Sequence, residues 1–161
     1  MLSAADLHRR GRASMDAGRF RTALRQLTAA LERNDEDERQ VRILLNLAHV
    51  ESTLGDPDAA FRRCDEAARR AATPRARALV HSQRAGLHLA AGDLERAGAL
   101  YDLAIPTLTG LARANALMNR GVIHLQQWSN DRAGRDFADA AALFLAEDDA
   151  IGTAQARHNA G

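Results

Sequence analysis

The sequence predicts an all-α protein made of stacked helical hairpins, and the first indication is a small residue that returns at nearly constant spacing. The steps between its successive copies are 37, 37, 36 and 40 residues. These copies are Gly11, Ala48, Ala85, Gly121 and Gly161. A fixed period in this range is typical of a solenoid, in which each hairpin packs on its neighbours.

Register and composition support the same fold class. A second-helix alanine recurs in step with the small residue, as Ala23, Ala60, Ala97 and Ala133. Apolar residues make up 46% of the chain but aromatic residues only 4%, so the interior is built mainly from Ala and Leu. A β-rich fold is disfavoured because Val, Ile, Thr and aromatic residues are scarce. We expect one domain over residues 1–161, with repeats at about 4–37, 41–74, 78–111 and 114–147 and a partial fifth at 150–161.

The first two hairpins carry clear start and stop signals. Ser3 can accept hydrogen bonds from the free amides of a first helix, which should end at Gly18. In the second hairpin Gly55 ends one helix, Asp56 caps the next, and Pro57 occupies its first position.

Later hairpins are marked less regularly. Gly92 makes the third turn, and Pro106 ends or bends the helix that follows it. A further helix should run over about 109–127, after which Trp128 stands where the other repeats have Gly. The segment 150–161 is interpreted as the first helix of a fifth repeat, with its apolar face left open.

The order of residues within one unit resembles the tetratricopeptide repeat (TPR). A small residue in the first helix, a turn glycine, an aromatic residue, and then an Ala, a bulky residue and an Ala follow one another as Gly11, Gly18, Phe20, Ala23, Leu27 and Ala30. The family's first-helix aromatic is replaced by Leu7, Leu44, His81 and Leu117, and its closing proline is absent. The resemblance implies a right-handed α-solenoid that binds proteins without catalysis.

In that family the first helices line the concave face, so the resemblance places a binding site there. Polar residues two positions before the small residue form a ladder of Arg9, Asn46, Gln83, Asn119 and Asn159. Carboxamides have donors and acceptors that suit the backbone of an extended peptide, although they can instead bond neighbouring helices. The full set of predicted binding residues is Arg9, Arg12, Asn46, His49, Gln83, Asn115, Asn119, Gln126 and Asn159. The family's carboxylate clamp, which binds chaperone C-termini, is not reproduced at its positions.

Catalytic and metal sites are not predicted. His88 and His124 share one repeat position, which favours structural histidines in a helix interface, and no histidine or cysteine pair has zinc-binding spacing. Cys64 occupies the position of Leu27 and is expected to be a buried small residue. We therefore expect no enzyme activity, cofactor or metal. Trp128 is either packed on an adjacent loop or exposed as an anchor for a partner.

Charge and composition restrict the partners. The net charge is only +1, so nucleic acid is an unlikely partner despite a locally basic N-terminal part. All 22 basic residues are Arg, which indicates a GC-rich bacterial genome, of actinobacterial type. A single cysteine and the lack of an apolar run of 18 residues lead us to expect a cytoplasmic protein with no membrane contact.

Two broader hypotheses concern assembly. The phrases His81-Ser82-Gln83-Arg84 and Arg157-His158-Asn159 resemble the N-terminal TPR arrays of actinobacterial proteins that end in a CHAT protease domain. That resemblance implies a recruiting or sensing arm of a longer protein. The alternative function is a structural scaffold, in which the open apolar face near Ile151 completes a homodimer.

Overall fold

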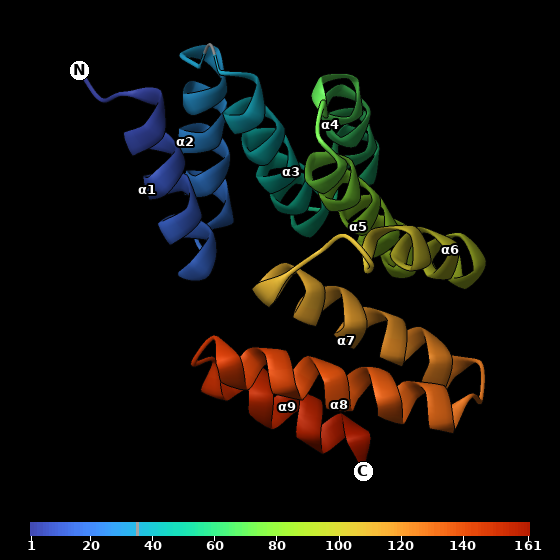
Figure 1. The fold of residues 1–161 in the computed structure, drawn as a ribbon. Coiled ribbons are helices and arrows are strands. Elements are labelled where there is room, and N and C mark those ends of the chain that lie inside the picture. The colour runs from blue at the N-terminus through green and yellow to red at the C-terminus, as the bar shows by residue number, and fades with distance from the viewer. Residues whose placement is uncertain (35) are drawn as a thin grey trace. The chain divides into compact units, whose positions relative to one another are not determined.

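The computed structural model describes residues 1–34 and 36–161, which fold into helices joined by short turns (Figure 1). Within these residues there are nine α-helices and no β-strand, so the predicted all-α class is confirmed. None of the described helices is both long and apolar enough to cross a bilayer. The chain divides into two compact units, Met1–Gln83 (unit 1) and Arg84–Gly161 (unit 2). The boundary falls inside α5, which spans Pro74–Ala90.

Unit 1 contains two helical hairpins and the first part of α5. Its helices are α1 (Ala4–Asp16), α2 (Phe20–Glu32), α3 (Asp37–Thr53) and α4 (Pro57–Arg70). In the first hairpin α1 packs on α2, and in the second α3 packs on α4. The two hairpins meet where α2 packs on α3. These are the first two hairpins that the repeat register predicts.

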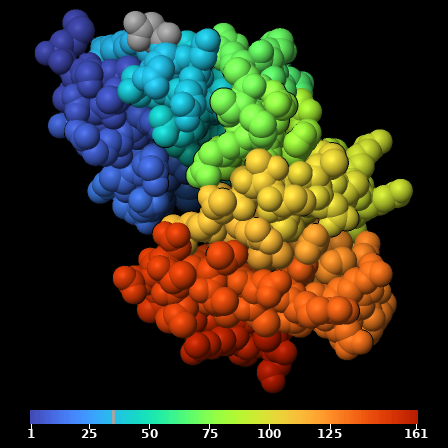
Figure 2. Space-filling model, viewed as in Figure 1, coloured from blue at the N-terminus to red at the C-terminus, as the bar shows by residue number. Residues whose placement is uncertain are grey.

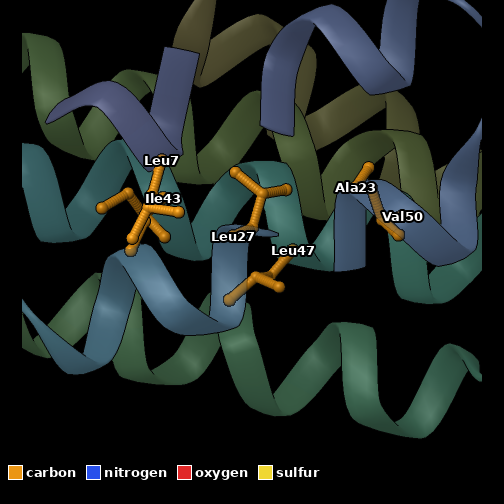
Figure 3. Close-up of a cluster of buried hydrophobic side chains, with 7 residues drawn as sticks. Leu7, Ala23, Leu27, Ile43, Leu47 and Val50 are labelled. Carbon is orange, nitrogen blue, oxygen red and sulfur yellow. The ribbon is translucent and has the colours of Figure 1, made fainter. Parts of the chain in front are cut away.

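The core of unit 1 is an apolar cluster that joins α1, α2 and α3 (Figure 3). Its buried members are Leu7, Ala23, Leu27, Ala30, Ile43, Leu47 and Val50. Those on α2 recur at spacings of three and four residues, which places them on one face of the helix. Full burial of a leucine such as Leu27 contributes roughly 1.5–3 kcal/mol relative to leaving it exposed. This shared face therefore holds three helices together.

Capping side chains act where the sequence predicts them. Ser3 Oγ accepts a hydrogen bond from the amide of Asp6 at 3.1 Å, and the Asp6 carboxylate accepts one from the amide of Ser3 at 3.3 Å. This reciprocal arrangement is a capping box. In the second hairpin Asp56 Oδ1 accepts from the amide of Ala59 at 2.9 Å, and Pro57 opens α4. Each bond satisfies an amide that has no partner inside its helix.

Unit 2 contains the rest of α5 and four further helices. They are α6 (Leu94–Ala104), α7 (Gly110–Gln126), α8 (Asn130–Ala146) and α9 (Ala150–Ala160). The helix α8 packs on both α7 and α9, and α6 packs on α7. The predicted end of a helix before Pro106 is confirmed, because α6 ends at Ala104.

The repeated small residue is needed where the two helices of a hairpin meet. A methyl group added to Gly11 of α1 would lie 2.6 Å from the side chain of Leu27 on α2. A methyl group added to Gly121 of α7 would lie 2.5 Å from the ring of Phe137 on α8. Both distances are well below van der Waals contact, so a larger residue would push the helices apart. In α4, Cys64 stands at the repeat position that Leu27 and Phe137 hold in α2 and α8, and it is fully buried, as predicted.

Candidate functional site

The predicted binding residues fall in both units, and each unit presents its own set. Unit 1 holds Arg9, Arg12, Asn46, His49 and Gln83, and unit 2 holds Asn115, Asn119, Gln126 and Asn159. In unit 1, Arg9 and Arg12 line a pocket between α1 and α3, and Asn46 contacts its wall. Gln83 lies on α5 and is half-buried.

The α1/α3 pocket is open and has a volume of about 450 Å³. Its lining residues are Ala5, His8, Arg9, Arg12, Ala13 and Asp16 of α1 and Arg39 and Arg42 of α3. Four of these eight residues are arginines and one is acidic. Positive charge gathered in a concave surface attracts anions, so this pocket is the candidate binding site of unit 1.

The four guanidinium groups differ in whether an acid neutralises them. Arg9 pairs with an aspartate on its own helix, and Arg39 pairs with Glu36 at 2.7 Å. Arg12 and Arg42 are exposed and form no ion pair with any residue in the described ranges. Arg39 was not predicted, although its spacing of three residues from Arg42 places both on one face of α3. The pocket therefore holds two arginines that are available to an anionic ligand.

His8 lies in the wall of the α1/α3 pocket and is neutral near pH 7. Burial, followed by the positive charges of Arg12, Arg42 and Arg39, lowers its pKa to about 4. The Nδ2 atom of Asn46 lies 2.9 Å from Nε2 of His8. Because an amide nitrogen only donates, Nε2 accepts this bond and the ring proton lies on Nδ1. The pocket thus combines charged guanidinium groups with a neutral imidazole.

His49 contacts α2. Its ring meets Phe20 edge-on, with the ring centroids 6.3 Å apart, and desolvation lowers its pKa. This geometry gives His49 a packing role between α2 and α3, whether or not it also binds a partner.

The predicted residues of unit 2 lie on two helices, α7 and α9. Asn119 Nδ2 donates to the hydroxyl of Tyr101 at 2.8 Å, so it links α7 to α6. Tyr101 is fully buried, and burial raises its pKa to about 12. Asn115 and Gln126 are exposed on α7, whereas Asn159 is half-buried on α9. For Asn119 the structure thus shows the interhelical bond that the sequence left open as an alternative.

A branched ion pair joins three helices of unit 2. Arg120 donates Nε and Nη2 to the two carboxylate oxygens of Asp136, at 2.8 and 2.7 Å, and Nη1 to Asp102 at 2.7 Å. The Asp136 side chain is only 7% exposed, and its hydrogen bonds raise the pKa of Arg120 further above its usual value. Unlike the two unpaired arginines of unit 1, this guanidinium has its acidic partners within the chain.

Other polar pairs inside the hairpins were missed by sequence reasoning. Ser14 Oγ donates to Gln26 at 2.8 Å in the first hairpin, and Arg63 Nε donates to Glu51 at 3.1 Å in the second. In each pair one residue lies three positions after the repeated small residue, and the other lies directly before the bulky second-helix residue. A comparison of these two positions across the repeats could therefore have predicted the polar pairs from the sequence.

Two histidines of unit 2 contact aspartates. His88 Nδ1 lies 3.6 Å from Asp93, and His124 Nε2 lies 3.7 Å from Asp136. These contacts agree with the structural role predicted for both histidines. Over residues 1–34 and 36–161, no group of three or more His, Cys, Asp or Glu side chains is placed to hold a metal ion.

Comparison with known proteins identifies similar folds. No protein-family model and no curated protein matches the chain. A solved structure described as pilF from Pseudomonas aeruginosa has a TM-score of 0.70 and 19% identity, over 98% of this chain and 74% of that one. A tetratricopeptide repeat protein from Parabacteroides merdae has a TM-score of 0.60 and 18% identity, over 98% of this chain and 58% of that one. BtubC from P. vanneervenii has a TM-score of 0.62 and 19% identity, over 93% of this chain and 75% of that one.

Proposed function

Because the chain has a tetratricopeptide-repeat fold, we propose that it is a non-catalytic module that binds a carboxylate-bearing segment of a partner protein in the α1/α3 pocket. One observation carries this proposal. Arg12 and Arg42 line a concave pocket, and neither has an acidic partner among the described residues.

Guanidinium chemistry favours a carboxylate as the ligand. An arginine presents several donors in a planar fork that matches the two oxygens of a carboxylate, and such charge-assisted bonds are stronger than neutral ones. Asp16 is the single acidic residue of the pocket lining, so a ligand carboxylate would meet a net positive surface. Side chains of Asp or Glu, or a chain terminus, provide this group.

Asn46 supports a smaller share of the proposal. Its amide nitrogen is engaged with His8 in the wall of the pocket. Its carbonyl oxygen still has lone pairs for a peptide amide, because it accepts independently of the nitrogen. We therefore assign affinity mainly to the arginines and assign backbone recognition in this pocket to Asn46.

A labelled peptide tests the proposal. A fluorescein-labelled hexaglutamate peptide should raise fluorescence polarisation on binding, whereas a hexaglutamine peptide of the same length should not. Replacing Arg12→Gln together with Arg42→Gln should weaken binding of the glutamate peptide by about tenfold, since each of the two solvent-exposed charged contacts contributes roughly 0.5–1 kcal/mol.

A matched control comes from another pocket of unit 1. Arg62 and Arg69 of α4 line a pocket whose lining also includes Glu51 of α3 and Asp65 and Glu66 of α4. Arg62→Gln together with Arg69→Gln removes the same charge but should leave binding unchanged. Equal losses in the two double variants would mean that the peptide responds to net charge alone, and the proposal would then fail.

Self-association is a second candidate function, favoured by the α8/α9 surface. Apolar residues of both helices line a pocket of about 410 Å³, and Leu145, which is one of them, is 58% exposed. Ile151 on α9 is 74% exposed. Burial of such residues against a second copy is favourable, and light scattering should then show a mass that rises with concentration. A monomeric mass at all concentrations, or no effect of Leu145→Glu with Ile151→Glu, would contradict this candidate.

A further inference from the structure

Trp128 lies in the turn between α7 and α8 in a conformation that costs free energy. Its φ is +59°, in the left-handed region that side chains disfavour. The equivalent turns of the first three hairpins place Gly18, Gly55 and Gly92 there, with φ of +69°, +89° and +80°. Glycine adopts this region without a steric penalty. The fourth hairpin therefore uses tryptophan at a position where its own backbone favours glycine.

The indole contributes almost nothing to the packing of unit 2. Trp128 is 90% exposed, which excludes the packed alternative that the sequence left open. The turn stands at one end of the α7–α8 hairpin (Figure 1), and its orange residues form part of the molecular surface (Figure 2). An exposed aromatic ring in a strained backbone has no stabilising role within the fold, which points to a role outside it.

The surroundings of Trp128 indicate the chemistry of what it meets. A shallow pocket of about 370 Å³ is lined by Trp128, Ser129, Asn130, Asp131, Arg132 and Arg135. Neither Arg132 nor Arg135 forms an ion pair with a described residue, and Arg135 Nε donates only to the backbone oxygen of Asp131 at 3.2 Å. The two arginines outnumber the single carboxylate of Asp131, so the surface beside the ring carries net positive charge.

We propose that Trp128 anchors a partner protein whose surface has an apolar cleft bordered by carboxylates. The indole fills the cleft, and Arg132 and Arg135 pair with the carboxylates at its edge. Trp and Arg are the residues that most often dominate protein interfaces, and an apolar centre with a polar rim is their usual arrangement. This contact surface is separate from the α1/α3 pocket and does not depend on the function proposed for that pocket.

A protein partner fits these residues better than a membrane does. A helix that lies on a bilayer needs an apolar face several residues long. Among residues 125–130 only Leu125 adds exposed apolar surface to that of Trp128, at 42% exposure, whereas Gln126, Gln127 and Asn130 are polar and exposed. Carboxamides at the rim suit hydrogen bonds to a protein surface.

The first test determines whether the indole of Trp128 stabilises the fold. Trp128→Gly should raise the melting temperature by about 2–4 °C, because the strain is relieved and no packing is lost. Leu103→Ala, which removes another exposed apolar side chain of unit 2, is the control and should leave the melting temperature nearly unchanged. A lower melting temperature for Trp128→Gly would show a structural indole and would overturn the proposal.

The second test uses a random peptide library displayed on phage and selected against the parent chain. The expected clones carry apolar and acidic residues, bind the parent and the Leu103→Ala variant, and lose binding to Trp128→Gly and to Arg132→Glu with Arg135→Glu. Trp128 is the only tryptophan, so a synthetic copy of such a peptide should shift its fluorescence emission to shorter wavelength. The proposal is overturned if no clone distinguishes the parent from Trp128→Gly, or if phosphatidylglycerol vesicles produce the emission shift and the peptides do not.

Discussion

Arg12 and Arg42 of unit 1 and Arg120 of unit 2 all lie on first helices of the same kind of repeat, but they are used differently. In unit 1, Arg12 and Arg42 line a pocket and have no acidic partner in the described part of the chain. In unit 2, Arg120 is bound by Asp136 and Asp102 and so ties three helices together. An arginine thus serves stability where acids face it across the hairpin and remains available for binding where they do not.

The same lesson follows from two asparagines at one repeat position. Asn46 contacts His8 on the preceding first helix, whereas Asn119 donates to Tyr101 on the preceding second helix. Both bonds lie between hairpins, but they join different pairs of helices. Repeat register therefore determines where a side chain stands, and the neighbouring residues determine what it does.

The largest predicted effect tests this contrast directly. Asp136→Ala should lower the free energy of unfolding by about 3–4 kcal/mol, because it leaves the partly buried Arg120 without its main partner. Arg42→Ala in unit 1 should change the free energy of unfolding by less than about 0.5 kcal/mol. Urea denaturation of both variants measures the difference. Similar losses would mean that Arg42 is also a structural residue, which would weaken its assignment to binding.

The second-largest predicted effect concerns the close packing of α7 on α8. Gly121→Ala should lower the free energy of unfolding by about 2–3 kcal/mol, because its methyl group would overlap the ring of Phe137. Phe137→Leu in the same chain should recover part of this loss, since the two residues are in contact and their effects couple. Thermal denaturation of the single and double variants measures the coupling free energy between the two positions. If the two changes in the free energy of unfolding simply add, the clash between the new methyl group and the ring does not determine the loss of stability.

Much of this fold could be predicted from the sequence because local signals and repeat register agree. The cap at Ser3, the cap at Asp56 and the helix end before Pro106 each depend on residues adjacent in sequence, and all three are present. The buried position of Cys64 follows from register alone. Such features depend on backbone geometry that every repeat shares.

The site was less predictable because its properties arise between helices. The pKa of His8 is lowered by burial and then by Arg12, Arg42 and Arg39, and the last two of these lie more than 30 positions later in the sequence. The partner of Arg120 depends on which face of α8 meets α7, and periodicity does not specify the partner of a single side chain. The 90% exposure of Trp128 depends on which residues pack against the α7–α8 turn, which the repeat position does not specify. Sequence reasoning therefore located candidate residues but did not determine which were already engaged.

The neutral His8 of unit 1 predicts that the stability of the protein depends on pH. The folded pKa of His8 is about 4, against 6.5 for the unperturbed ring, so below pH 6.5 the unfolded chain binds a proton that the folded chain does not. Stability should therefore fall as pH decreases from about 6.5 to 4. The loss from this residue should be roughly 1–2 kcal/mol, about half of what the full pKa shift corresponds to, because His8 is only half-buried and water screens the neighbouring charges. His8→Gln keeps an acceptor for Asn46 and should lose less stability over that range. Equal pH slopes for parent and variant in urea denaturation would contradict a desolvated His8.

The smallest predicted effect compares the turns of the second and fourth hairpins. Gly55→Trp should lower the free energy of unfolding by about 1 kcal/mol, because φ of +89° penalises any side chain there. Trp128→Gly should raise it by a similar amount, since glycine relieves the same strain. The sites lie in different compact units, so the double variant should match the parent within about 0.5 kcal/mol. A gain at residue 128 without a matching loss at residue 55 would mean that the α3–α4 turn relaxes to accept a side chain, and that left-handed strain alone does not distinguish the two hairpins.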